Sequence, residues 1–189
     1  MTFCGTKILK SAFQATTLRT AGFYSIDQSE LTSVSKLIAV CMMFIGGSPV
    51  GTAGGIKTVT IVILIAAALA TVKNNNETSL WQRTISKDAI RKAIAVVFMS
   101  SAILFISTVL LSLTCDAAAL DILYETVSAT ATVGLTKNFT PSLNFWGKII
   151  ITATMYLGRI GPISLAFAFN FKKVNDNKIE NPNEKISVG

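Results

Sequence analysis

The stretch that decides the fold is residues 46–55, which reads Gly-Gly-Ser-Pro-Val-Gly-Thr-Ala-Gly-Gly. It lies in the middle of a long apolar region, Leu37–Val72, which contains one charge, Lys57. A continuous helix of that length would measure about 54 Å, well beyond a hydrocarbon core of about 30 Å. Five glycines and a proline in ten residues also disfavour a helix interior. The stretch therefore predicts a membrane helix that is broken near its middle.

A break at this depth points to a transport path. Lipid cannot satisfy the N–H and C=O groups of irregular backbone, so such backbone is tolerated only inside protein or beside a water-filled cavity. Discontinuous membrane helices commonly line the site of an ion or a substrate.

The composition agrees with a membrane protein. Of the 189 residues, 51% are apolar and 14% are charged, and the mean hydropathy is +0.56. Soluble domains have roughly 25% charged residues. The absence of histidine excludes a Ser-His-Asp triad, a Cys-His pair and a His-ligated metal. The three cysteines are too scattered for a CxxC zinc or redox motif. We therefore predict an all-α integral membrane protein that is not an enzyme and has no cofactor of its own.

Two further apolar segments are long enough to cross a membrane. Ala93–Cys115 contains no charge, and Ile149–Phe171 contains one, Arg159. As a helix, the first would extend roughly 35 Å, enough to cross a hydrocarbon core of about 30 Å. A guanidinium within the bilayer is costly, so we expect Arg159 to face a bundle interior or a wet cavity. Two shorter segments, Ala12–Arg19 and Asp121–Ala131, have the character of re-entrant half-helices, each followed by a short extended strand.

The basic residues indicate the orientation of the chain. They gather in Lys73–Lys92 and at Lys172-Lys173, and positive loops favour the cytoplasmic side. This places residues 73–92 and the polar tail, residues 172–189, in the cytoplasm. The net charge of +7 then mostly reflects the basic residues of the cytoplasmic segments, so no nucleic acid is expected as a partner.

The chain contains an internal repeat. When residue 20 is aligned with residue 132, an offset of 112, seven of the 27 positions from Thr20 to Gly46 are identical. They include Thr20 and Thr132, Gly22 and Gly134, and Gly46 and Gly158. We therefore expect two copies, running the same way, of a half-helix, a Thr-x-Gly strand, an outer loop and an inner helix.

The Thr-x-Gly strands suit the binding of a dehydrated cation. Backbone carbonyls can replace the hydration shell of the ion, and glycine adopts the unusual backbone angles that this requires. The half-helix would direct its partly negative C-terminal end toward the cation. Because two loops cannot surround an ion, two more must come from another chain or from a missing part of this one.

At this point the sequence resembles the Trk/Ktr/HKT superfamily of potassium transporters, and within it the bacterial Ktr membrane subunit. Four motifs support the resemblance, which reaches to about Phe171: Arg19-Thr20-Ala21-Gly22-Phe23, Gly46–Thr58, Ala131-Thr132-Val133-Gly134-Leu135-Thr136, and Tyr156-Leu157-Gly158-Arg159-Ile160-Gly161-Pro162.

The resemblance implies four helix–pore-loop–helix repeats of potassium-channel type, of which this chain carries the last two. Residues 1–72 would be the third repeat without its outer helix, and residues 93–171 the fourth. The implied selectivity filter consists of Thr20, Ala21, Gly22, Phe23, Thr132, Val133, Gly134 and Leu135. The implied gate consists of Gly46, Gly47, Ser48, Pro49, Gly51, Thr52, Gly54 and Gly55, with Arg159 opposing cations below the filter.

The resemblance also implies partners and a location. We expect uptake of K⁺, with Na⁺ as the alternative ion and symport as a mechanism, at the plasma or inner membrane. The expected partners are the missing first half of the pore or a second membrane chain, a second complete subunit in a homodimer, a cytoplasmic nucleotide-binding regulatory subunit and the lipid bilayer.

Other interpretations stay open in part. A phosphate-binding P-loop is disfavoured because Ile56, not glycine, precedes Lys57. An intramembrane enzyme is disfavoured because Ala93–Cys115 and Leu37–Val72 contain no carboxylate. The remaining alternatives are a secondary transporter with a broken-helix substrate site and a truncated remnant that does not conduct.

Overall fold

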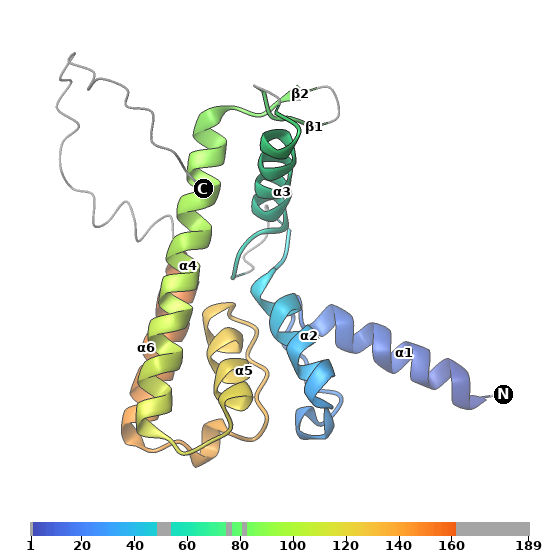
Figure 1. Cartoon of the computed structure of the whole chain (residues 1–189). Coiled ribbons are helices and arrows are strands. Elements are labelled where there is room, and N and C mark those ends of the chain that lie inside the picture. Colours follow the sequence, from blue (N-terminus) through green and yellow to red (C-terminus); the bar gives the residue numbers. More distant parts are fainter. Residues whose placement is uncertain (1, 49–53, 75–76, 81–82, 162–189) are drawn as a thin grey trace.

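The computed structural model describes residues 2–48, 54–74, 77–80 and 83–161. In chain order the elements are α1 (Thr2–Thr17), η1 (Gln28–Glu30), α2 (Ser33–Phe44), α3 (Thr58–Val72), β1 (Ser79–Leu80), β2 (Arg83–Thr84), α4 (Lys87–Thr114), α5 (Ala119–Thr130), η2 (Thr140–Ser142) and α6 (Phe145–Ile160). The two short strands pair antiparallel and form the turn between α3 and α4. The described chain is therefore almost entirely helical (Figure 1).

The predicted break in the apolar region is confirmed. α2 ends at Phe44 and α3 begins at Thr58, and the two helices extend about 18 and 22 Å. Ile45 and Ile56 form a parallel bridge, in which the Ile56 N–H donates to the Phe44 carbonyl at 3.1 Å. The residues that follow α2 and precede α3 thus pair with each other, and neither α2 nor α3 alone is long enough to cross a bilayer.

The predicted apolar helix at Ala93–Cys115 is also confirmed. α4 has 28 residues and begins at Lys87, where the Ser86 side chain accepts a hydrogen bond from the Ala89 N–H. Within the described residues it is the one helix that is long and apolar enough to cross a membrane. It packs against α3, α5 and α6.

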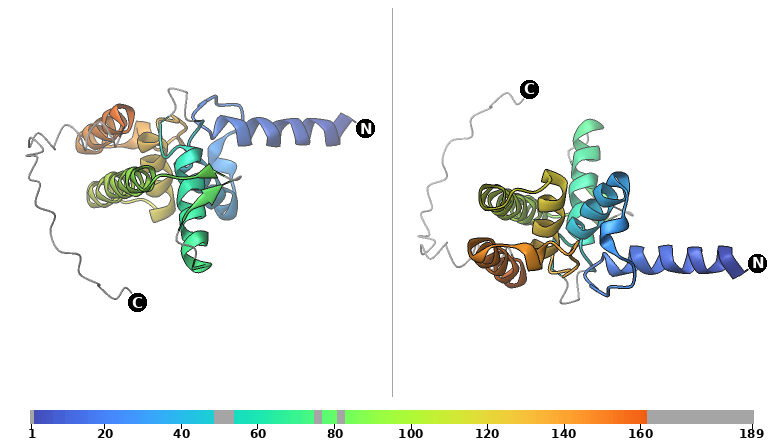
Figure 2. Two further views of the ribbon diagram at one scale, coloured as in Figure 1. Left: turned by 90° about the horizontal axis from the view of Figure 1, so that it is seen from above. Right: turned by 90° about the horizontal axis from the view of Figure 1, so that it is seen from below.

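The half-helix α5 is the centre of the described fold (Figures 1 and 2). It lies between the α4–α6 pair and α2. Its side chains enter two apolar clusters. One cluster joins Tyr124 and Val127 to Met43 of α2, and the other joins Ile122 and Ala129 to α4 and α6.

The internal repeat is visible in the structure. η1 and η2 begin at Gln28 and Thr140, and α2 and α6 begin at Ser33 and Phe145, so both pairs keep the offset of 112. The two helix starts are also capped in the same way. The N-cap side chains of Thr32 and Asn144 each accept a hydrogen bond from the N–H three residues later. The expectation of two equivalent units is therefore confirmed for these elements.

Three predictions need correction. The first half-helix begins at Thr2 rather than Ala12, so α1 is longer than its apolar part and points away from the other helices (Figure 1). The segments after α1 and α5 are not extended strands, because Thr20 and Thr132 have positive φ. The inner helix of the second repeat does not continue through residue 161: α6 ends at Ile160 and Gly161 has φ +84°. Residues 162–189, which include the predicted tail, lie outside the described residues.

Candidate functional site

The two Thr-x-Gly turns adopt the same unusual backbone. Thr20 and Gly22 have φ of +65° and +73°, and Thr132 and Gly134 have φ of +56° and +85°. A left-handed conformation is uncommon for threonine, and each turn therefore holds its threonine in a conformation that the surrounding structure must stabilise. Because this pattern recurs at equivalent positions of the two repeats, both turns are built alike.

The two turns lie side by side. A Cβ atom placed on Gly22 would lie 2.1 Å from the Val133 carbonyl oxygen. This separation is far below van der Waals contact, and the obstacle is backbone, which cannot move aside as a flexible side chain can. Gly22 is therefore glycine for two reasons, its positive φ and the close approach of the second turn.

Side chains fasten each turn to its neighbouring half-helix. In the first repeat, the Thr17 hydroxyl at the end of α1 donates to the Phe23 carbonyl at 2.8 Å. In the second repeat, the carboxylate of Glu125 on α5 accepts hydrogen bonds from the hydroxyls of Thr136, at 2.9 Å, and Thr140. Glu125 is buried, at 4% exposure, so this anchor is shielded from water.

Polar contacts also join the first repeat to the second. The Tyr124 hydroxyl of α5 donates to Gln28 Oε1 at 3.0 Å, and both side chains are fully buried. In the first turn of α5, Asp121 forms ion pairs with Lys36 at 3.5 Å and Lys137 at 2.7 Å. These contacts hold the second half-helix against the first inner helix.

Electrostatics favour the charged forms of Asp121 and Lys137 in this cluster. Partial burial alone would raise the pKa of Asp121, but the hydrogen bond and charge of Lys137, together with Lys36, hold it below its ordinary value. The hydrogen bond to Asp121 in turn raises the pKa of Lys137. The hydrogen bond from Lys137, together with desolvation, lowers the pKa of Lys36, so the charged form is favoured for Asp121 and Lys137 but not for Lys36.

The sequence reasoning did not find these residues. The sequence offered one signal for Lys36, because Lys36 and Lys148 are among the seven identical positions of the repeat. No comparable signal identified Gln28 and Tyr124, because these two partners are 96 residues apart in the chain. The same holds for Glu125, whose hydrogen-bond partners are up to 15 residues away.

The glycine-rich segment reaches the second turn. A Cβ on Gly54 would lie 2.3 Å from Thr132 Oγ1 and 2.6 Å from the Ala131 carbonyl oxygen, and one on Gly46 would lie 2.2 Å from the Gly54 carbonyl oxygen. Gly55 has φ +70°. The predicted gate residues Gly46, Gly47, Ser48, Gly54 and Gly55 are thus described, whereas Pro49, Gly51 and Thr52 lie outside the described residues.

Arg159 lies in the last turn of α6 and is exposed on the described chain. The preceding Gly158 touches the end of α5, since a Cβ there would lie 2.2 Å from the Thr130 carbonyl oxygen. Gly161, two residues after Arg159, ends the helix with positive φ. The Gly161-Pro162 pair is an ordinary sequence signal for a helix end, and it coincides with the end of α6 at Ile160.

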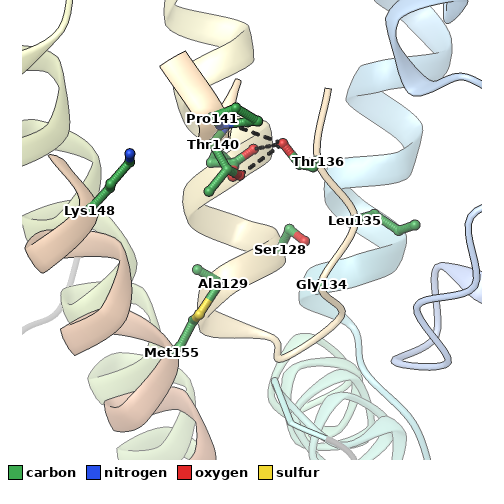
Figure 3. Close-up of a pocket in the computed structure, with 10 residues that line it drawn as sticks. Ser128, Ala129, Gly134, Leu135, Thr136, Thr140, Pro141, Lys148 and Met155 are labelled. Atoms are coloured by element: carbon green, nitrogen blue, oxygen red, sulfur yellow. Dashed lines mark hydrogen bonds between the residues drawn. The ribbon is translucent and has the colours of Figure 1, made fainter. Parts of the chain in front are cut away.

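A cavity of about 460 Å³ lies beside the second turn, between α5 and α6 (Figure 3). Its lining includes Gly134, Thr136 and Thr140 from the loop and Ser128 and Glu125 from α5. Lys148 and Met155 reach it from α6 (Figure 3). Unlike Gly22, Gly134 faces this open space, with nothing within 4 Å of a Cβ atom placed on it.

Comparison with known proteins identifies the family of the chain. Residues 2–180 match the sequence model of the TrkH family, described as a cation transport protein. The chain is 39% identical over 183 residues to the Ktr system potassium uptake protein B of Bacillus subtilis, covering 97% of this chain and 41% of the relative. It is 37% identical to the protein of that name from Vibrio alginolyticus, covering 86% of this chain and 36% of the relative.

The potassium/sodium uptake protein NtpJ of Enterococcus hirae is 32% identical, with 97% of this chain and 42% of the relative covered. The chain thus spans well under half the length of the curated relatives that it matches. On the family match and these identities, the chain belongs to the TrkH family of cation transport proteins, within the Trk/Ktr superfamily.

Proposed function

We propose that this chain forms two of the four pore loops of a potassium uptake protein, with the carbonyls of the two Thr-x-Gly turns contributing half of a selectivity filter. The single observation that supports this most strongly is the pair of adjacent turns, each with left-handed residues at the threonine and the glycine. Alternating left-handed and ordinary residues direct successive carbonyls to one side, as a carbonyl-lined filter requires.

The filter residues under this proposal are Thr20 to Phe23 and Thr132 to Leu135. The half-helix α5 ends at Thr130, immediately before the second turn, so its partly negative end lies beside the proposed ion site. The names of the relatives support K⁺ as the ion, with Na⁺ also named for NtpJ.

A cell membrane location follows from the same proposal. α4 is long and apolar enough to cross a bilayer, and large apolar side chains are exposed along it, among them Phe98 and Phe105 at 70%. A surface of this kind is unfavourable in water and suits contact with lipid. The C-terminus is cytoplasmic in this proposal, because the basic segments flank the apolar spans on one side.

The glycine-rich segment is proposed as the gate below the filter. Its support is the contact of Gly54 with Ala131 and Thr132, which join α5 to the second turn. A segment in this place could obstruct the ion path or withdraw from it. Arg159, in the last turn of α6, would add a positive charge that opposes cations on the same side.

Two further loops and a regulatory subunit are the proposed partners. The chain covers 41% of its Bacillus subtilis relative, and we propose that the first half of such a pore, or a second membrane chain, supplies the two further loops. The phrase "Ktr system" in the relatives' names supports assembly with other subunits, for which we propose a homodimer of complete pores and a cytoplasmic nucleotide-binding subunit.

The test is a chimera in which this chain replaces the matched part of the Bacillus subtilis relative. Expressed in a bacterium that lacks potassium uptake, the chimera is expected to restore growth at low K⁺ and rubidium uptake, whereas this chain alone is expected to restore neither. In the chimera, Gly134→Ser should reduce K⁺ preference over Na⁺ by about tenfold, since a side chain strains the left-handed turn by about 1–3 kcal/mol.

Gly5→Ser is the matched control, because Gly5 lies in α1 with open space around its Cβ position. It should leave the uptake ratio unchanged. A Gly134→Ser chimera that keeps the original ion preference would contradict the filter role of this turn.

A further inference from the structure

The two Thr-x-Gly turns share a backbone conformation, but different side chains hold them. In the first repeat, the Thr17 hydroxyl donates directly to a carbonyl of the turn, that of Phe23. The position equivalent to Thr17 in the second repeat is Ala129, which has no hydroxyl. The second turn is instead held through Glu125, at a position that Phe13 occupies in the first repeat.

The Glu125 carboxylate holds both ends of the segment that follows the second turn. Thr136 Oγ1 donates to Oε2 at 2.9 Å, and Thr140 Oγ1 donates to Oε1; Figure 3 shows these hydrogen bonds as dashed lines at the two threonines. An ionised carboxylate can only accept, so both hydroxyl protons point toward it. The Thr136 oxygen remains an acceptor for the Thr140 N–H, at 3.4 Å. One side chain thus closes residues 136–140 into a loop, which we call the carboxylate clamp.

The carboxylate clamp lies where it can act on the second turn. Thr136 directly follows Leu135, the last residue of the proposed filter in this repeat. Val133 and Leu135 are both buried in one apolar cluster. Apolar packing therefore fixes these two side chains, while Glu125 fixes the direction in which the backbone leaves the turn.

A carboxylate is well suited to hold a backbone in one position. Glu125 is 4% exposed, and burial of a carboxylate is unfavourable unless hydrogen bonds compensate for the lost water. Hydrogen bonds to an ionised acceptor are shorter and stronger than those between neutral groups. They therefore restrict both threonines tightly, as a turn requires if its carbonyls are to replace the hydration shell of an ion.

We propose that Glu125 is a positioning residue for ion selectivity, which acts through the hydroxyls of Thr136 and Thr140 on the carbonyls of the second turn. The inference rests on the proposed function, since it assigns the control of the filter to a residue outside it. The control belongs to the second repeat alone, because the first repeat has Phe13 and Gln28 at the positions of Glu125 and Thr140.

Variants of the chimera test this role by the competition of Na⁺ with rubidium uptake. Glu125→Gln keeps the shape of the side chain but offers one acceptor oxygen instead of two. It should lower the preference for K⁺ over Na⁺ by about tenfold, as expected for the loss of a hydrogen bond to a charged group. Thr140→Val removes a donor and should have a similar effect, whereas Thr140→Ser keeps the hydroxyl and should keep the preference.

Thr71→Val is the matched control, because Thr71 is exposed in α3 and its hydroxyl bonds the Ala67 carbonyl of its own helix. It should leave the preference unchanged. If Glu125→Gln does not reach the membrane, the comparison of Thr140→Val with Thr140→Ser gives the result. Variants that lose stability but keep the original ion preference would overturn the inference, because the carboxylate clamp would then be structural only.

A double-mutant cycle in this chain alone keeps the inference separate from the proposed function. The variant that combines Glu125→Gln with Thr140→Val should unfold at no lower temperature than the more damaging single variant, because partners in one network are not additive. Additive losses would overturn the inference without any transport measurement. A lack of uptake by the unmodified chimera would instead contradict the proposed function.

Discussion

The first repeat meets its neighbour along a buried face, whereas the same face of the second repeat is open, although both are built on the same backbone. Met43 is fully buried and Met155 is 43% exposed, and Gly22 abuts the Val133 carbonyl while Gly134 has free space. Equivalent residues thus have different surroundings. Burial at these positions depends on the next repeat in the series, and the second repeat has no such neighbour in the described part of this chain.

The two half-helices, α1 and α5, also differ in how much of their surface is buried. α5 is packed on three sides by α2, α4 and α6 and has eight buried residues out of twelve. α1 has large exposed apolar side chains, including Ile8 at 66% and Leu9 at 71%. α5 is thus enclosed by neighbouring helices, whereas much of the apolar surface of α1 is exposed among the described residues.

The largest expected effect distinguishes the two filter glycines. Gly22→Ala should strongly destabilise this chain, because its Cβ meets the Val133 carbonyl oxygen at 2.1 Å, whereas Gly134→Ala should cost only the left-handed strain of about 1–2 kcal/mol. Thermal unfolding in detergent, followed by circular dichroism, measures both. In the chimera with a complete set of loops, the two substitutions should become similarly damaging. Equal effects in the isolated chain would argue against the adjacency of the two turns.

The next effect tests burial directly. Met43→Ala removes a fully buried side chain and should reduce the free energy of unfolding by about 2–5 kcal/mol. Met155→Ala, at the equivalent exposed position, should cost less than about 1 kcal/mol in this chain and more in the chimera. Denaturant titration of both variants provides the measurement. A Met155→Ala cost that does not rise in the chimera would mean that no partner covers this face.

A smaller effect is expected at the hydrogen bond between the repeats. Tyr124→Phe removes the donor to Gln28 Oε1, which keeps a second donor in Gln14, so the expected cost is about 1 kcal/mol. Tyr156→Phe is the control, since Tyr156 is 68% exposed. The midpoint of thermal unfolding should fall for Tyr124→Phe and not for Tyr156→Phe. An equal fall in both variants would mean that the buried hydrogen bond does not stabilise the fold.

The smallest effect depends on pH. The pKa of Asp121 lies below its ordinary value in the folded chain, so its ion pairs stabilise the fold above the unfolded pKa of about 3.9. This contribution is lost as the pH falls through the lower folded value. Asp121→Asn should therefore reduce stability at neutral pH and flatten its dependence below about pH 4. If the variant loses stability below about pH 4 as the unmodified chain does, other carboxylates cause the acid sensitivity of the fold.

Local chemistry made much of the fold predictable. The glycine and proline content of residues 46–55 predicted the interruption between α2 and α3, and the uncharged run at Ala93–Cys115 predicted α4. The identities at an offset of 112 predicted two units of the same kind, which the matching helix starts confirm. Each of these signals depends on residues close together in sequence or on direct comparison of two copies.

The errors arose where a neighbour or a single residue overrides the local pattern. The apolar run at Ile149–Phe171 hid the end of α6 at Ile160, because hydropathy takes no account of the backbone at Gly161. The expected extended strands proved to be left-handed turns at Thr20 and Thr132. The roles of the predicted filter and gate residues remain proposals that the transport experiments test.

The amino-acid sequence by itself determined the apolar character, the broken helix, the repeat and the family, because these depend on composition, spacing and motifs. Only the tertiary structure revealed that Gly22 faces the second turn while Gly134 faces a cavity, and that α5 bridges the repeats through Tyr124 and Asp121. The reason is physical. Two similar local sequences fold to the same backbone, but their contacts depend on which segment packs against each, and that is decided by distant parts of the chain.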